Sequence, residues 1–452
     1  MTELPVEHEA ARRAAQTVLE LEGADGVEVV VSGSRTALTR YANSEIIQNT
    51  VRNELRAYVR VVTGERSASA TTNQLDEKHL RFAADAALEA ARASRPDPDF
   101  PGLPDPDSVG RGEGLFAWDD DTASASPGRR AAAVAEILAA AAADNAAGVF
   151  ETSGHAYGVF STTGIDCFDA YTRCVTTCLV DVENATGWGE ASSHAIAEVD
   201  VAAAARRAAD KAKRGAATRD ADPGTYEVIL EEPAVATLID FLSYSGFGAK
   251  AVIEGESFLS SRSGKKVAAD SVTVADDVAF PGSVGIGFDF EGVPKRRAAV
   301  IGAGQATGPV TDLRTAGKLG TSSTGHFSGS TEWGPYASNV VLEPGEKSLE
   351  EMIGSVERGL LVTRFHYVNI LDRPDTLLTG MTRDGTFAIQ GGEIAGAVHN
   401  LRFTQSVLDA LASVVDVGGR TAAFAPEYGS FGSTVAPALR IGEFRFTSGT
   451  SH

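Results

Sequence analysis

The stretch FDFEGVPKRRAAVIGAGQATGPVTDLRTAGKLGTSSTGH, from Phe288 to His326, says most about how this chain folds. It opens on an acidic D-F-E-G-V-P segment, continues through the apolar run AAVIG into a glycine turn, and ends on the polar triplet S-T-G. Glycine supplies the backbone conformations that tight turns need. Its density between Gly282 and Gly334 therefore predicts a twisted, β-rich domain with many tight turns.

Regular elements are expected on both sides of this stretch. Upstream, Glu232-Pro233 introduces residues 233–251, where apolar side chains recur at helical spacing. Downstream, the sequence predicts short strands and two further helices, near residues 348–359 and 406–414.

The start of the chain predicts a helix over residues 7–22, followed by four alternating segments between residues 26 and 73. Turn-forming Gly, Asn and Ser separate these segments, and Asp76 can cap the helix that follows them. A helix, a meander of strands and a second helix form an α+β unit with one face of its sheet covered.

The middle of the chain is also expected to contain strands between two helices. Ser126 and Pro127 start a helix, strands follow to Glu183, and residues 184–194, which contain Gly, Trp and His, are expected to form a loop. A last helix ends at Gly215.

Stretches rich in Pro, Gly and Asp mark the domain boundaries, with a linker over residues 95–126 and a turn at 220–224. The predicted class is α+β, with N-terminal helix/antiparallel-sheet domains followed by a larger β-rich C-terminal domain. The predicted domains are a first α+β domain, a central α+β domain and a β-rich third domain, at residues 20–90, 115–215 and 224–450.

The motif order in Phe288–His326 resembles the third domain of the TldD/PmbA metallopeptidase family, which shares D-x-E-G-x-P, a strand with a glycine turn, D-x-x-x-A and S-T-G. In TldD-type members an H-E-x-x-x-H helix lies upstream. Here the corresponding segment is Leu238–Gly246 (LIDFLSYSG), in which Asp240, Phe241 and Ser245 take the places of the first His, the Glu and the second His.

The substitutions at these positions bear directly on zinc chemistry. Two imidazoles about one helical turn apart can bind one metal ion, and a nearby carboxylate can polarise its water. Asp, Phe and Ser cannot reproduce that chemistry. The TldD type also supplies a cysteine ligand from a C-terminal loop, and the corresponding residues 418–444 contain no cysteine.

The resemblance therefore implies a PmbA/TldE-type subunit with no catalytic residue, metal ligand or cofactor of its own. It implies a hetero-oligomer in which a zinc-bearing TldD-type paralogue hydrolyses the peptide bond. Such complexes degrade or trim unfolded peptides, or mature peptide antibiotics, inside cells. Which residues contact the substrate is unknown at this stage.

Two alternatives stay open. The runner-up is a stand-alone homodimeric protein that binds or regulates peptides without peptidase activity. A third and weaker option is a metal-independent hydrolase that uses residues without a recognisable motif.

The composition of the chain excludes some kinds of binding partner. The 452 residues carry a formal net charge of −21, which repels a phosphate backbone, so no nucleic-acid partner is expected. No apolar run approaches the ~20 residues that span a bilayer, and the charged N-terminal sequence does not match a signal peptide. A cytoplasmic protein without membrane contact is expected.

The remaining candidate sites are weak. Glycine clusters near residues 282–287 and 301–308 lack the helix and acidic residue of a dinucleotide site. Cys174 and Cys178 fall on a predicted strand and are interpreted as two buried side chains rather than metal ligands. His326 stands where the family often has Asn, and a surface or turn position is expected for it.

Overall fold

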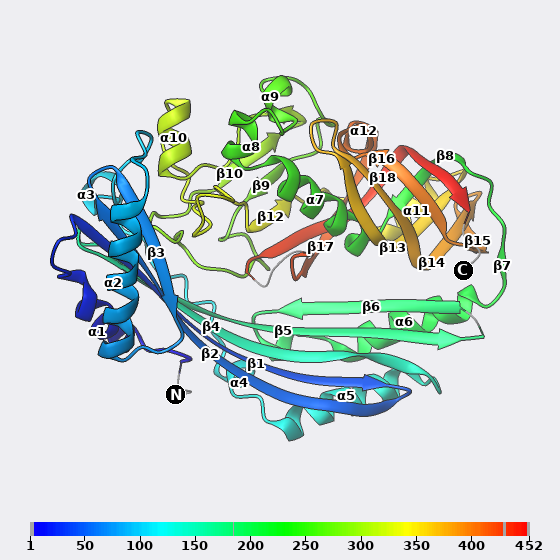
Figure 1. Cartoon of the computed structure of the whole chain (residues 1–452). Coiled ribbons are helices and arrows are strands. Elements are labelled where there is room, and N and C mark those ends of the chain that lie inside the picture. The colour runs from blue at the N-terminus through cyan, green and yellow to red at the C-terminus, as the bar shows by residue number, and fades with distance from the viewer. Residues whose placement is uncertain (1–3, 184, 428–430, 450–452) are drawn as a thin grey trace.

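The computed structural model describes residues 4–183, 185–427 and 431–449, which form two parts stacked on each other (Figure 1). The N-terminal half of the chain builds a long, curved sheet. The C-terminal half builds a larger β-rich part above it. The predicted α+β class is confirmed.

The N-terminal sheet has six antiparallel strands in the order β3-β2-β1-β4-β5-β6. The strands are β1 Gly26–Ala42, β2 Glu45–Thr63, β3 Arg66–Thr72, β4 Ala146–Ser161, β5 Asp166–Val182 and β6 Ala185–Ser193. Strand β1 pairs with β4, so the hydrogen-bonded ladder crosses the boundary predicted between residues 20–90 and 115–215.

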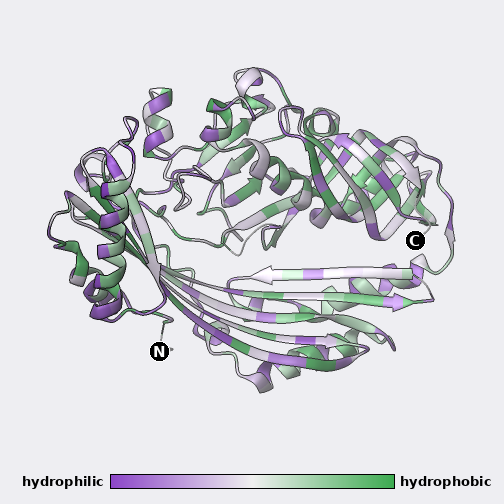
Figure 2. Cartoon of the chain, in the orientation of Figure 1, coloured by the Kyte–Doolittle hydropathy of each residue, from purple (hydrophilic) through white to green (hydrophobic). Residues whose placement is uncertain are grey.

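The two faces of this sheet have different neighbours. Side chains alternate along a strand, so Val29 and Val31 pack with the helices while Val30 packs with Phe288 from the C-terminal half. Figure 2 shows this alternation of hydropathy along the strands. The helices of this half are α1 His8–Leu19, α2 Glu77–Ala93, α3 Pro106–Val109, α4 Asp120–Ala123, α5 Pro127–Ala141, α6 Val201–Gly215 and the 3-10 turn η1 Ile196–Glu198.

The C-terminal half contains a twelve-stranded sheet in which β16 pairs with both β14 and β18. The strands β18, β8, β13, β14 and β16 therefore close a ring. The strand bounds are β7 Thr218–Arg219, β8 Gly224–Leu230, β9 Val274–Asp276, β10 Ala298–Gly302, β11 Gln305–Ala306, β12 Asn339–Leu342, β13 Arg358–Asp372, β14 Leu377–Gln390, β15 Glu393–Val398, β16 Leu401–Ser406, β17 Val414–Phe424 and β18 Ser433–Gly449.

The described residues of this half form six helices, and α7 packs against β13 and β18 in its largest hydrophobic core. Their bounds are α7 Glu232–Gly246, α8 Ala249–Ile253, α9 Leu259–Arg262, α10 Leu313–Leu319, α11 Leu349–Gly354 and α12 Val407–Ala412. Among the described residues no helix is long and apolar enough to cross a membrane.

The acidic turn that opens the stretch Phe288–His326 links the two halves. One Asp289 oxygen accepts bonds from the amides of Glu291 and Val293, which holds the turn. Glu291 then reaches Arg60 on β2, with the guanidinium nitrogen 3.1 Å from the carboxylate. At Gly292, φ is +77° and a Cβ would lie 2.4 Å from a side-chain carbon of Ile165, so this position requires glycine.

One prediction about strands was wrong. The four segments expected between residues 26 and 73 are three strands, because the chain turns only twice there, at Asn43–Ser44 and at Gly64–Glu65. Gly33 is not a turn residue: it lies inside β1, where a Cβ would come 3.0 Å from Pro5. The glycine-rich region 282–334 holds the short strands β10 and β11 and the helix α10, with turns between them, inside the β-rich half that the glycine density predicted.

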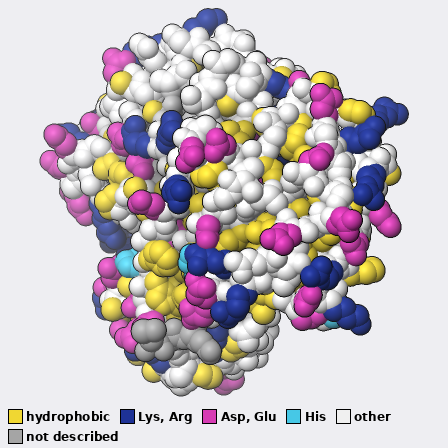
Figure 3. Space-filling view, turned by 90° about the vertical axis from the view of Figure 1, so that its left-hand side faces the viewer, with side chains coloured by type: hydrophobic (Ala, Val, Ile, Leu, Met, Phe, Trp, Pro, Cys, Tyr) yellow, Lys and Arg dark blue, Asp and Glu magenta, His cyan; other side chains and the backbone are white. Residues whose placement is uncertain are grey.

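The surface carries both acidic and basic side chains, although the net charge is negative. On the face shown in Figure 3, acidic and basic side chains are interspersed, with apolar side chains between them.

Candidate functional site

Helix α7 carries the three positions that correspond to the zinc motif. The helix begins directly after β8, where Glu231 is the N-cap residue and Pro233 lies in the first turn. Pro fixes a helical φ angle there and lacks only an N–H that has no helical partner. Successive residues of a helix point about 100° apart, so Asp240 and Phe241 face different surroundings.

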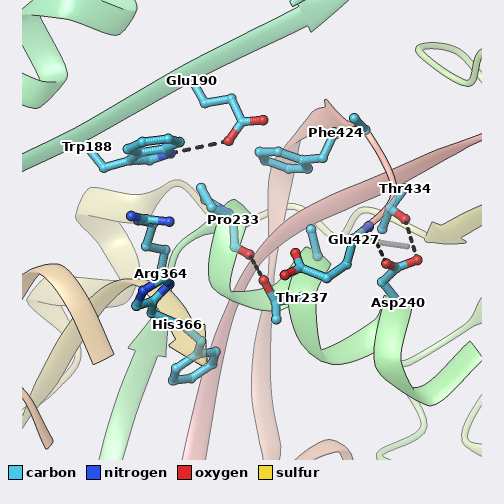
Figure 4. Close-up of a pocket in the computed structure, with 13 residues that line it drawn as sticks. Trp188, Glu190, Pro233, Thr237, Asp240, Arg364, His366, Phe424, Glu427 and Thr434 are labelled. Atoms are coloured by element: carbon cyan, nitrogen blue, oxygen red, sulfur yellow. Dashed lines mark hydrogen bonds between the residues drawn. The ribbon is translucent and has the colours of Figure 1, made fainter. Parts of the chain in front are cut away.

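Asp240 faces a small cavity between the two halves (Figure 4). One carboxylate oxygen accepts a hydrogen bond from the backbone amide of Glu427 at 2.7 Å, and the other accepts from the Thr434 hydroxyl at 3.2 Å. The side chain is only 4% exposed. Burial raises the pKa of Asp240 to about 6, since the charged form loses its hydration.

The other two positions point elsewhere. Phe241 is fully buried in the core around α7. Ser245 is also buried, and its hydroxyl donates to the carbonyl of Leu242 in its own helix at 3.2 Å. Only one of the three positions therefore reaches the cavity.

These side chains do not fit a zinc ion. A catalytic zinc site needs about three protein ligands that converge on one point. Here both Asp240 oxygens already accept hydrogen bonds, Phe241 has no ligand atom, and Ser245 lies on another side of the helix. Within residues 4–183, 185–427 and 431–449, no group of three or more His, Cys, Asp or Glu side chains is placed to hold a metal.

Strand β6 forms the opposite wall of the cavity, through Trp188 and Glu190. The Trp188 indole N–H donates to the Glu190 carboxylate at 3.2 Å. Loss of hydration raises the pKa of Glu190 to about 7, so this carboxyl titrates near neutral pH.

Neither residue was among the sites expected from the sequence, because a loop was expected over 184–194. The glycines that suggested a loop serve close packing instead. A Cβ at Gly189 would lie 1.9 Å from the Ala204 carbonyl oxygen of α6, and one at Gly187 would lie 2.0 Å from that of Ala208. The alternation G-W-G-E was the signal, since it places Trp188 and Glu190 on the face away from the helix.

Strand β13 contributes the cationic side of the cavity. The guanidinium carbon of Arg364 lies 4.1 Å from the Trp188 ring centroid, within the range of a cation–π contact. Its Nε also donates to Asp384 at 2.6 Å. Loss of hydration, together with Arg364, lowers the pKa of His366 on the same strand.

The cavity has a volume of about 120 Å³, room for one small group. The Asp240 carboxylate accepts a hydrogen bond from a backbone amide, and Trp188 with Arg364 offers a flat surface for an apolar or planar side chain. The cavity can therefore hold a small apolar or planar group beside carboxyl groups.

His326, expected at the surface or in a turn, is buried, so the surface position was wrong; it follows a bend at Gly325. Its Nε2 lies 2.9 Å from the Asp276 carboxylate and its Nδ1 lies 2.9 Å from the Thr324 hydroxyl. The prediction for Cys174 and Cys178 is confirmed, since both thiols are buried on β5.

Comparison with profiles of known protein families shows which family this chain belongs to. The profile described as the PmbA/TldA metallopeptidase C-terminal domain matches residues 223–448, half of the chain. The chain belongs to the PmbA/TldA metallopeptidase family. The profile of metallopeptidase domain 1 from the same family matches residues 27–91.

Individual relatives agree with this assignment. The fold is similar to that of TldE from Thermococcus kodakarensis, with a TM-score of 0.84 and 21% identity over 97% of this chain and 99% of that one. A metalloprotease from Methanothermobacter thermautotrophicus is 26% identical over 221 residues, 48% of each chain. A metalloprotease from Methanocaldococcus jannaschii is 26% identical over 161 residues. These sequence matches span about half, or less, of the curated relatives.

Proposed function

We propose that this chain is the subunit of a TldD/TldE-type metallopeptidase complex that lacks the zinc motif. The complex degrades unfolded peptides or matures peptide precursors inside the cell, and a zinc-bearing TldD-type paralogue supplies the hydrolysis. The observation that carries the proposal is Asp240, which stands at the first histidine position and has both oxygens bound to Glu427 and Thr434.

The cavity around Asp240 supports a role in substrate binding. It lies where β6 of the N-terminal sheet meets α7 and β13 of the C-terminal half, so both halves of the chain shape it. In our proposal, Trp188 and Arg364 bind a side chain of the peptide while the carboxyl groups accept its amide hydrogens. The chain then positions the peptide and the partner cleaves it.

The test compares this chain alone, the paralogue alone, and the two purified together after co-expression. Zinc is measured by elemental analysis, and activity on an unstructured peptide. We expect zinc and activity only where the paralogue is present, and higher activity in the combined sample. If the chain alone cleaved the peptide and EDTA abolished that activity, the proposal would be wrong.

A matched pair of variants separates binding from folding in the combined sample. Trp188→Ala removes the ring that Arg364 stacks on, and we expect it to raise KM several-fold with unchanged zinc content. Phe82→Ala removes a ring of similar size that is 76% exposed on α2, far from the cavity, and should leave KM unchanged. Equal KM values for both variants would contradict a substrate role for the cavity.

A further inference from the structure

A second cavity lies beside the acidic turn that opens the stretch Phe288–His326, and it shares no lining residue with the cavity around Asp240. Its volume is about 160 Å³. An engineered protein cavity of about 150 Å³ binds benzene. The lining includes four Phe and Tyr side chains, those of Phe290, Phe327, Tyr336 and Phe431. The cavity therefore has the size and the lining to hold one ring or one branched apolar group.

The aromatic wall of this cavity is held in place by the N-terminal sheet. The ring centroids of Phe290 and Phe431 lie 5.2 Å apart. The ring of Tyr157 on β4 lies 5.8 Å from the first and 5.6 Å from the second. These are the spacings of packed aromatic pairs, so both halves of the chain give the wall its shape.

Lys295 brings a positive charge to this apolar cavity. Its ammonium donates to the Ser338 hydroxyl at 2.5 Å and to Oδ1 of Asn339 at 3.0 Å. An ammonium carries three N–H donors, and within the described ranges no residue accepts from the third or forms an ion pair with it. A charge that leaves water without a counter-ion is costly, and burial accordingly lowers the pKa of Lys295.

The position of the ammonium is fixed by Asn339. The amide nitrogen of this side chain donates to the Val284 carbonyl at 3.0 Å and to the Ser433 hydroxyl at 3.3 Å. The amide oxygen is therefore the atom that faces Lys295. With two of its donors fixed in this way, the ammonium keeps one donor for a ligand.

The acidic residues near Lys295 have other partners. Asp276 lies 2.9 Å from Nε2 of His326 and accepts from the backbone amide of Asn339 at 2.7 Å. One Asp289 oxygen accepts the two amides of the acidic turn, and the other accepts from the backbone amide of Phe327 at 2.9 Å. Neither carboxylate therefore serves as the counter-ion of Lys295.

We propose that this cavity binds a small apolar carboxylic acid, whose carboxylate accepts the third N–H of Lys295 while the aromatic side chains surround its apolar group. A hydrogen bond between an ammonium and a carboxylate is among the strong ones. Two sources present this chemistry: a free acid such as an acylated apolar amino acid, and the C-terminal residue of a peptide. This inference does not rest on the proposed peptidase role.

Isothermal titration calorimetry of the purified full-length chain tests the proposal with N-acetylphenylalanine and with its C-terminal amide. We expect the acid to bind at least about tenfold more tightly, since only the acid carries a carboxylate for Lys295. Equal affinities for the acid and the amide, or no measurable binding of the acid, would overturn the proposal. The comparison uses the natural chain, so it is decisive whether or not a variant folds.

A matched pair of lysine variants tests the role of the ammonium. Lys295→Met keeps an unbranched apolar side chain but removes the charge, and should weaken binding of the acid at least about tenfold. Lys266→Met is the control, because this lysine is exposed and pairs with Asp270 outside the cavity. Its affinity for the acid should equal that of the natural chain. An unchanged affinity in a Lys295→Met variant with native circular dichroism would contradict the proposal.

Two competitors of N-acetylphenylalanine identify the ligand more closely. A short peptide that ends in phenylalanine with a free carboxylate should compete at least as well if peptide termini are the source, and more weakly if the source is a free acid; either result supports the site. Inorganic phosphate lacks an apolar group and should not compete. Competition by phosphate as strong as that by N-acetylphenylalanine itself would reveal a general anion site and reject the proposal.

Discussion

The buried carboxyl of Asp240 gives a prediction whose size follows from the structure. We consider Asp240→Asn, which keeps the shape of the side chain but removes its charge. The amide oxygen can accept from the backbone N–H of Glu427, and the amide nitrogen can donate to the Thr434 hydroxyl. Both hydrogen bonds therefore survive, and the change isolates the effect of charge.

The magnitude comes from the pKa. Burial raises the pKa of Asp240 to about 6 in the folded protein, from about 3.8 for an exposed aspartate. A raised carboxyl pKa means that the folded state prefers the protonated form, so the charge destabilises it above pH 6. This penalty disappears as the pH falls from 6 toward 4, and it amounts to about 3 kcal/mol at full charge. Asp240→Asn should remove it.

The assay is urea unfolding of both proteins at several pH values between 4 and 8. We expect the variant to be more stable than the natural chain by up to about 3 kcal/mol at pH 8, with the difference vanishing near pH 4. Asp85→Asn on the exposed side of α2 is the control, and should change stability by less than about 0.5 kcal/mol throughout. A difference that does not vary with pH would refute the reasoning.

Three other substitutions test the packing, each by its unfolding free energy in urea. Gly189→Ala forces a Cβ against the α6 backbone and should lower the unfolding free energy by about 1–3 kcal/mol. Gly128→Ala on α5, where a Cβ would make only an ordinary contact with the Ser126 hydroxyl oxygen at 3.8 Å, should not lower it. Arg60→Met leaves two buried carboxylates without their cation and should cost about 3–5 kcal/mol. Phe241→Ala should lower the unfolding free energy by about 3–5 kcal/mol, a loss that would not occur if this ring faced solvent.

Local patterns predicted much of the fold. The helices starting at Asp76 and Ser126 begin where a side-chain cap was expected, because capping depends on a few neighbouring residues. The α+β class followed from the same kind of signal. The pairing of β1 with β4 could not be predicted, since hydrogen bonds between residues 28–41 and 148–161 leave no mark in either segment.

The site was harder to predict than the fold. The motif positions led to Asp240, but not to the cavity it faces, because Trp188 and Arg364 come from strands about fifty residues before and more than a hundred after it. Gly187 and Gly189 misled the prediction, since glycine marks both a turn and a close contact between a strand and a helix. Only the three-dimensional arrangement separates these two meanings.

Strand β18 has a consequence for how the chain folds during synthesis. It pairs with β8, β12, β16 and β17, so it lies at the centre of the C-terminal half. Its neighbour β8 is made about two hundred residues earlier. The ring of strands therefore cannot close until β18 emerges, and β8 and β16, its two neighbours in the ring, must wait with open edges. Closure over such long separations is slow, which makes the growing chain a natural client for chaperones.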